Sequence, residues 1–194
     1  KQTQLTDSVN KQSKEYGQWL FSGAFSTKGF TGINPDYRIT QGDSLLVQLW
    51  GGLDFQQEIQ VDAQGNVFIP KVGPIKVLGV KNSQLNKVVL KSIKRVYKSN
   101  VQAYVSLISS QTVKVYLAGM VNKPGLYEGN SADSIMAFID QAGGIRKKLG
   151  SYRFIQVKRQ NKVVNNIDLY AFLQNGMITN TQLQDGDVIL VQPK

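Results

Sequence analysis

One ten-residue phrase occurs twice in this chain, and it constrains the fold more than any other feature. The copies read ITQGDSLLVQ at 39–48 and LQDGDVILVQ at 183–192, and five of the ten aligned positions are identical. In each copy Gly-Asp precedes an apolar run of strand length. Glycine lets the chain turn with a positive φ, and aspartate accepts a local backbone N–H. The phrase therefore predicts, at both ends, a strand that enters a core directly after a tight turn.

The first copy lies in a β-rich unit that we place at 33–110. Alternating apolar residues predict a strand at 45–50 with both faces covered in part. The alternation in residues 57–70 predicts a hairpin that turns at 62–66. Further β elements are expected at 72–80 and 101–108. The clearest helix spans 82–98, with Asn82 or Ser83 as its expected cap. Its apolar stripe consists of Leu85, Val88, Val89, Ile93 and Val96.

The second copy ends a unit that we place at 111–194. We expect a strand and return arm around the turn at 122–125, then a helix at 131–144 capped by Ser131 or Asn130 and ended by two glycines. A second hairpin at 153–169, a short helix at 170–176 and a closing strand at 187–192 follow. Residues 1–32 are expected to form a helix at about 4–20 and an irregular aromatic segment, pinned either against the body or against a neighbouring subunit. The predicted fold class is α+β, in two small domains.

The amino-acid composition limits which kinds of catalysis, metal binding and partners the chain can support. It contains neither Cys nor His, which removes thiolate nucleophiles, the commonest general base and the commonest metal ligand. With 23 Lys and Arg against 13 Asp and Glu, the net charge is +10. Such an excess attracts nucleic acid, anionic lipid or acidic polysaccharide, or it serves only as a soluble basic surface. No cofactor is expected.

The turn aspartates allow two interpretations. Asp43, Asp62, Asp185 and Asp187 could gather as metal ligands or acid/base partners. We favour a structural role, because Asp and Gly are the usual turn residues and the other ligands of a calcium loop are missing. We therefore predict no catalytic residue and no metal ligand. A glycan-cleaving enzyme stays as a third hypothesis, which would need two convergent carboxylates.

The predicted helix at 82–98 carries a basic stripe. Its members recur every three or four residues: Lys87, Lys91, Lys94 and Lys98. This pattern indicates either a solvated helix face, which we favour, or a surface that contacts a polyanion. The stripe has no interleaved aromatic residues, which argues against nucleic acid as a partner.

Two ordered sets of residues give the chain a family resemblance. Residues 36–79 resemble the polysaccharide export domain of outer-membrane capsule and exopolysaccharide exporters of the Wza and KpsD type. The residues that carry this resemblance include Tyr37, Gly42, Asp43, Asp62, Gly65, Pro70 and Gly73. Residues 113–191 resemble the soluble-ligand-binding β-grasp (SLBB) domain that follows in the same family. They include Gly119, Pro124, Gly125, Gly143, Gly144, Gly186 and Asp187.

The resemblance implies a small export domain with one helix, followed by a β-grasp-like domain, in a protein that conducts polysaccharide without catalysis. Its implied partners are further copies of itself in a ring, the exported polysaccharide and an inner-membrane polysaccharide co-polymerase. Its implied location is the periplasm, associated with the outer membrane. Because the sequence shows no signal peptide, lipidated Cys or C-terminal amphipathic helix, we expect a periplasmic fragment. The alternative function is a periplasmic glycan-binding module without a transport role.

Overall fold

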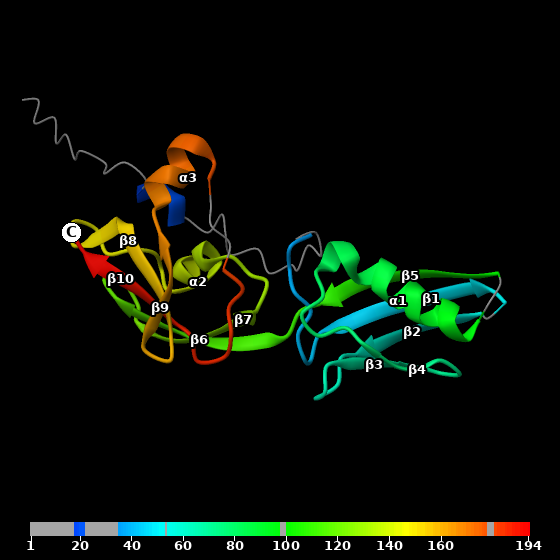
Figure 1. Ribbon diagram of the computed structural model, residues 1–194. Coiled ribbons are helices and arrows are strands. Elements are labelled where there is room, and N and C mark those ends of the chain that lie inside the picture. Colours follow the sequence, from blue (N-terminus) through cyan, green and yellow to red (C-terminus); the bar gives the residue numbers. More distant parts are fainter. Residues whose placement is uncertain (1–17, 22–34, 53, 98–99, 178–180) are drawn as a thin grey trace, which may run out of the picture.

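The computed structural model describes residues 18–21, 35–52, 54–97, 100–177 and 181–194. Within them the chain forms two units, each with its own hydrophobic core (Figure 1). Both units mix helices with a majority of strands, so the predicted α+β class is confirmed. Most of the helix expected at about 4–20 lies outside the described residues. The described part is a 3-10 helix, η1 (Gln18–Phe21), whose buried Leu20 packs in the core of the second unit.

The first unit is a small antiparallel sheet covered by one helix. Its three-stranded sheet has the order β2-β1-β5, and a two-stranded sheet joins β3 to β4. The elements are β1 (Ser44–Gly51), β2 (Phe55–Gln60), β3 (Asn66–Ile69), β4 (Gly73–Lys76), α1 (Asn82–Val96) and β5 (Val101–Ser109). Alternate residues of β5 are buried beneath α1, as the period-two pattern predicted.

The hairpin predicted at 57–70 is wrong. The strand β2 pairs with β1, opposite Ser44 to Leu49, whereas β3 pairs with β4. The turn between them does form, because Asp62 Oδ1 accepts the backbone N–H groups of Gln64 (2.9 Å) and Asn66 (2.8 Å). The chain thus reverses where expected, but its two arms enter different sheets.

The helix α1 begins at Asn82, as predicted, but its capping residue differs from the prediction and it ends at Val96 rather than at 98. Lys81 is the N-cap and its side chain makes no capping bond; the backbone N–H groups of Asn82 and Ser83 donate to the carbonyls of Tyr37 and Pro35. The preceding chain therefore supplies the acceptors that a capping side chain would otherwise provide. Only part of the predicted stripe is buried, and Val96 is exposed.

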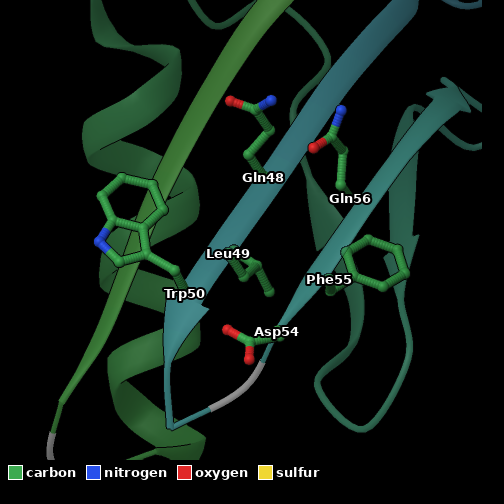
Figure 2. A pocket seen from close by; sticks show the side chains of 6 residues that line it. All are labelled: Gln48, Leu49, Trp50, Asp54, Phe55 and Gln56. Atoms are coloured by element: carbon green, nitrogen blue, oxygen red, sulfur yellow. The ribbon is translucent and has the colours of Figure 1, made fainter.

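The face of the three-stranded sheet that lies away from α1 is open. Figure 2 shows Gln48, Trp50 and Gln56 in front of the strands, with α1 behind them. Trp50 on β1 and Tyr104 on β5 are 49% and 50% exposed. We expected this second face to be partly covered, and within the described residues its aromatic side chains remain half exposed.

The second unit is a five-stranded mixed sheet in the order β7-β6-β10-β8-β9. Its elements are β6 (Thr112–Gly119), β7 (Gly125–Asn130), α2 (Ile135–Gln141), β8 (Gly150–Arg159), β9 (Lys162–Ile167), α3 (Leu169–Asn175) and β10 (Val188–Pro193). The first and last strands, β6 and β10, run parallel at its centre, and every other pair is antiparallel. This order is that of a β-grasp domain, in agreement with the prediction.

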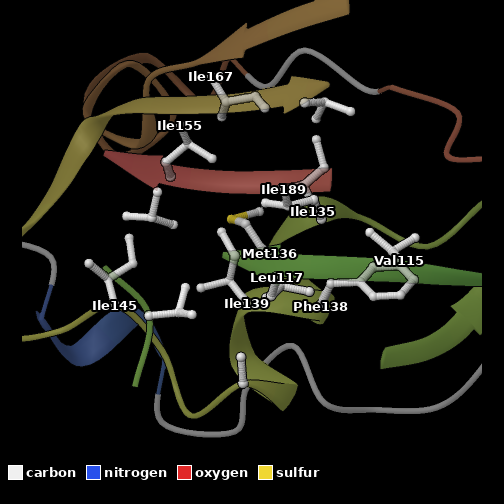
Figure 3. Packing of buried hydrophobic residues seen from close by; sticks show 14 of the residues in the cluster. Val115, Leu117, Ile135, Met136, Phe138, Ile139, Ile145, Ile155, Ile167 and Ile189 are labelled. Carbon is white, nitrogen blue, oxygen red and sulfur yellow. The ribbon is translucent and has the colours of Figure 1, made fainter. Parts of the chain in front are cut away.

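The core of the second unit lies between this sheet and α2. Figure 3 shows Met136, Phe138 and Ile139 of α2 directed toward the sheet residues Leu117 and Ile189. The helix is shorter than predicted, and its cap is Ser134, whose Oγ accepts from the Ala137 N–H at 3.2 Å. Ser131 and Asn130 were therefore wrongly predicted as caps. Ser131 instead lies buried where the two units meet.

Candidate functional site

Asp43, in the first copy of the repeated phrase, is the centre of a buried polar cluster. Its carboxylate is fully buried and accepts hydrogen bonds at both oxygens. Oδ2 accepts from the Thr40 N–H (2.8 Å), and Oδ1 accepts from the Tyr37 hydroxyl (2.9 Å) and the Gln111 N–H (2.8 Å). Gly42, with φ of 86°, makes the turn that brings the carboxylate back onto Thr40.

This cluster joins the two units, and we call it the junction (Tyr37, Thr40, Asp43, Gln111 and Ser131). Gln111 lies between β5 and β6, and Ser131 directly follows β7. The Ser131 hydroxyl lies 2.8 Å from the Tyr37 oxygen. Because Tyr37 uses its only proton on Asp43, Ser131 is the donor to Tyr37. A chain of hydrogen bonds therefore runs from the second unit into the turn of the first.

A second, more exposed contact lies beside the junction. The Arg38 backbone N–H donates to Gln182 Oε1 at 3.2 Å, and Gln182 Nε2 donates to the Arg38 carbonyl at 2.8 Å. Ala132 also packs against the core of the first unit. Buried polar bonds, the contact of the Gln182 side-chain amide with the Arg38 backbone, and an apolar contact thus hold the units together.

Burial sets the proton affinities in the junction. It raises the pKa of the Asp43 carboxyl, and the N–H groups of Thr40 and Gln111 oppose this effect. Burial also raises the pKa of Tyr37 to about 12. Burial thus explains both pKa shifts. The polar atoms of Asp43 and Tyr37 already have hydrogen-bond partners inside the cluster, so neither shift indicates a catalytic group.

The raised pKa of Tyr37 predicts a loss of stability in alkali. Because an unfolded tyrosine ionises near its ordinary value of 10.0, the stabilisation is complete below that pH and is lost as pH rises toward about 12. The expected loss is about 2–3 kcal/mol. Urea unfolding measured at several pH values should show this slope in the natural chain and a flatter one in Tyr37→Phe. Tyr116→Phe, at a half-exposed tyrosine, should keep the natural slope; equal slopes in all three proteins would contradict the prediction.

Asp187, in the second copy, repeats the turn with a different partner. Gly186 has φ of 82°, and Asp187 Oδ2 accepts from the Gln184 N–H at 2.9 Å, as Asp43 does from Thr40. The remaining partner is Arg159, whose Nε and Nη2 each donate to the carboxylate at 2.8 Å. This hydrogen bonding raises the pKa of the Arg159 guanidinium. The two copies therefore share one strand-entry turn and use their buried carboxylates differently.

The turn aspartates do not converge on one site. Asp62 stabilises the turn before β3, and Asp185 accepts from the Lys114 N–H at 2.8 Å. Among the residues that the structure describes, no three carboxylates come close enough to hold a metal ion. Each of the four aspartates accepts at least one backbone N–H, which is the structural role that we favoured.

The other residues that carried the resemblance lie in turns spread over both units. Pro70 and Gly73 lie at the β3–β4 turn, Pro124 and Gly125 at the β6–β7 turn, and Gly143 and Gly144 after α2. At Gly119 a Cβ would lie 2.1 Å from the Val191 carbonyl oxygen, so β6 and β10 meet too closely there for a side chain. Gly65, with φ of 80°, completes the turn that Asp62 begins.

The basic stripe is exposed along α1. Lys87, Lys91 and Lys94 face solvent, whereas Lys98 lies outside the described residues. Arg95, which the sequence reasoning missed, extends this surface. The helix contains no acidic residue, and within the described part of the chain neither salt bridge involves these four cations. The structure thus places on the first unit a basic surface that has no salt bridge to any described residue.

Comparison with known proteins follows the same division. Residues 31–108 match the family described as polysaccharide biosynthesis/export protein, and residues 113–191 match the SLBB domain. The chain belongs to the polysaccharide export family. Its export domain contains Tyr37 and Asp43, its SLBB domain contains Ser131, and the junction joins the two.

Two curated relatives indicate the breadth of this similarity. The chain is 49% identical over 183 residues to the polysialic acid transport protein KpsD of Escherichia coli, covering 94% of this chain and 33% of the relative. It is 25% identical over 183 residues to the EPS I polysaccharide export outer membrane protein EpsA of Ralstonia nicotianae, covering 81% of this chain and 48% of that protein. The chain therefore spans about a third to a half of these relatives. None of its described helices is long and apolar enough to cross a membrane.

Proposed function

We propose that this chain is the periplasmic part of an outer-membrane polysaccharide exporter, and that it guides a finished polymer without making or breaking a bond. The observation that carries the proposal is the export domain followed by an SLBB domain across a buried junction. Such a junction holds two domains in a fixed relation, which suits one segment of the wall of a passage. The relatives named for polysialic acid transport and EPS I export support the same role.

The proposal extends to the partners of the full-length protein. Copies of the protein form a ring around a hydrophilic passage, the exported polysaccharide moves through it, and an inner-membrane co-polymerase docks from below. The family resemblance supports this arrangement. The mass of the full-length protein in detergent tests the ring: a large closed oligomer is expected, and a monomer at all concentrations would argue against it.

A deletion experiment tests the transport role. Cells that lack the gene should carry little surface polysaccharide and should accumulate polymer inside, because synthesis continues without exit. The full-length gene should restore surface polymer, whereas a gene lacking the codons for 35–194 should not. A strain blocked in polymer synthesis is the control, since it has polymer neither inside nor outside. Normal surface polymer in the deletion strain would refute the proposal.

The basic surface of α1 favours a second candidate function, a glycan-binding module without transport. Four exposed cations without a neighbouring carboxylate on the helix attract an anionic polymer. We predict that changing Lys87, Lys91 and Lys94 together to Glu weakens binding of an anionic polysaccharide such as polygalacturonate by about tenfold or more. Isothermal titration at two salt concentrations is the measurement, and binding by the natural chain should weaken as salt rises.

A matched variant separates this surface from net charge. Lys123, Lys147 and Lys162 are exposed lysines of the SLBB domain, and changing all three to Glu alters the net charge by the same amount. This variant should bind nearly as well as the natural chain if α1 is the contact surface. Equal weakening in both triple variants would mean that net charge alone is responsible, and no saturable binding by the natural chain would remove this candidate.

A further inference from the structure

The open face of the export sheet differs in chemistry from the rest of this basic chain. Its strands β1, β2 and β5 contain no lysine or arginine, although the chain has 23. Glu58 is the one charged residue within the three strands. Apart from Glu58 and Ile108, the exposed side chains on this face are amides and aromatic rings.

The strand register places these groups side by side. Gln48 on β1 lies opposite Gln56 on β2 and Tyr104 on β5, and Trp50 lies opposite Gln102. Trp50 and Tyr104 are therefore diagonal neighbours on one face, a position that typically places the two Cα atoms about 7–8 Å apart. Two half-exposed rings thus lie next to a pair of glutamine amides.

The face is hollowed beside Trp50. A shallow cavity of about 470 Å³ is lined by Gln48, Leu49, Trp50, Asp54, Phe55 and Gln56. Figure 2 shows the amides of Gln48 and Gln56 on neighbouring strands, with the Asp54 carboxylate near the end of the hollow. The volume lies within the range of small-molecule sites, which combine apolar walls with a few polar groups that set orientation.

We propose that this face binds a segment of uncharged pyranose units. Flat tryptophan and tyrosine rings offer an apolar surface to the C–H face of a sugar ring, while glutamine amides donate to and accept from its hydroxyls. Among the described residues of the three strands and the hollow, the charged groups are Asp54 and Glu58, and both are anionic, so they repel an anionic ligand and accept hydrogen bonds from hydroxyls. That these sugar units belong to an exported polysaccharide rests on the proposed function. The binding of sugar at this face does not rest on it.

A second copy of the chain fits these observations less well. The centre of a protein–protein interface is closely packed, whereas this face is hollowed and carries several exposed amides that need polar partners. Saccharide hydroxyls supply such partners at high density. The surface also lies on the opposite side of the sheet from the basic helix α1, so a ligand on one of the two surfaces would leave the other accessible.

Tryptophan fluorescence of the 194-residue chain tests the proposal. Of the two tryptophans, Trp19 is changed to Phe so that the signal reports Trp50 alone. Cellohexaose, maltohexaose and chitohexaose serve as neutral probes, with polygalacturonate as an anionic one. Saturable change with at least one neutral probe is expected, with little change at the same concentration of the anionic polymer.

Substitutions locate the binding. By isothermal titration, Trp50→Ala and Tyr104→Ala should each weaken binding of the neutral probe about tenfold. Tyr116→Ala, at a tyrosine of the SLBB domain with the same 50% exposure as Tyr104, should leave it unchanged. Gln48→Leu tests the amide contribution without reducing side-chain volume, and it should also weaken binding.

The outcomes separate this proposal from its alternatives. It is overturned if none of the neutral probes binds saturably, or if Trp50→Ala binds as well as the natural chain. It is also overturned if Trp50→Ala alters only self-association, measured by analytical ultracentrifugation, since the face would then be an interface between copies. Sugar binding is measured on the purified chain and export on surface polymer in cells, so a failure of this proposal is distinguishable from a failure of the export role.

Discussion

An Asp43→Ala variant is expected to lose about 3–4 kcal/mol of unfolding free energy, because it leaves several buried donors without an acceptor. The Thr40 N–H, the Gln111 N–H and the Tyr37 hydroxyl all donate to this carboxylate. Asp43→Asn should lose only about 1–2 kcal/mol, since the amide oxygen can replace Oδ1 and only the bond from the Thr40 backbone N–H to Oδ2 is lost. Urea unfolding followed by circular dichroism measures both values.

The control for Asp43 is Asp62, an exposed turn aspartate. Asp62 accepts two backbone N–H groups, but water can replace it as their acceptor. Asp62→Ala should therefore lose much less unfolding free energy than Asp43→Ala. If Asp43→Ala cost no more than Asp62→Ala, burial would not govern the junction. If Asp43→Ala fails to fold, the smaller loss in Asp43→Asn still tests the assignment of donors.

Local features of the fold could be predicted from sequence. The strand β5 follows from alternation at Val101, Ala103, Val105 and Leu107, because a strand with one buried face must repeat every second residue. The β-grasp order was implied by the family resemblance, and the sheet order confirms it. In both cases the information lies within a few neighbouring residues or in an ordered motif.

Errors arose where a distant segment supplied a partner. The cap of α1 was assigned by residue type, but the carbonyls of Pro35 and Tyr37 accept the first N–H groups of the helix. Serine is a common helix-capping residue, yet the Ser131 hydroxyl forms a hydrogen bond with Tyr37, 94 positions away in the sequence. A side chain that suits two roles equally well gives no local signal for choosing between them.

The junction shows the same limit. The Gly-Asp turn identifies Asp43 as an acceptor of a nearby N–H, which Thr40 supplies. Its further partner Gln111 is 68 residues away, and the sequence around Gln111 has no distinguishing feature. Trp50 was visible as part of an alternating strand, but its exposure depends on which face α1 covers. The packing of the whole unit determines which face of the sheet α1 covers.

Arg159→Met is expected to destabilise the SLBB domain by about 3 kcal/mol, because it leaves the fully buried Asp187 carboxylate without a countercharge. The guanidinium donates two 2.8 Å bonds to Asp187 and a third, at 3.1 Å, to the Gln182 carbonyl. Methionine keeps much of the side-chain volume, so the loss reports the ion pair more than the packing. Arg159→Lys should be intermediate, since a single ammonium cannot reproduce the two-pronged geometry.

The Lys81–Asp36 pair provides the comparison. It has a similar 2.7 Å contact but is exposed, with 38% and 74% of its side chains accessible. Lys81→Met should therefore change the unfolding free energy far less than Arg159→Met does. Hydrogen exchange should localise the effect of Arg159→Met: amides of β8 and β10 exchange faster, while those of α1 change little. A loss below 1 kcal/mol would mean that the turn at Gly186 and the backbone N–H of Gln184 suffice to stabilise the buried carboxylate, and that Arg159 acts only at the surface.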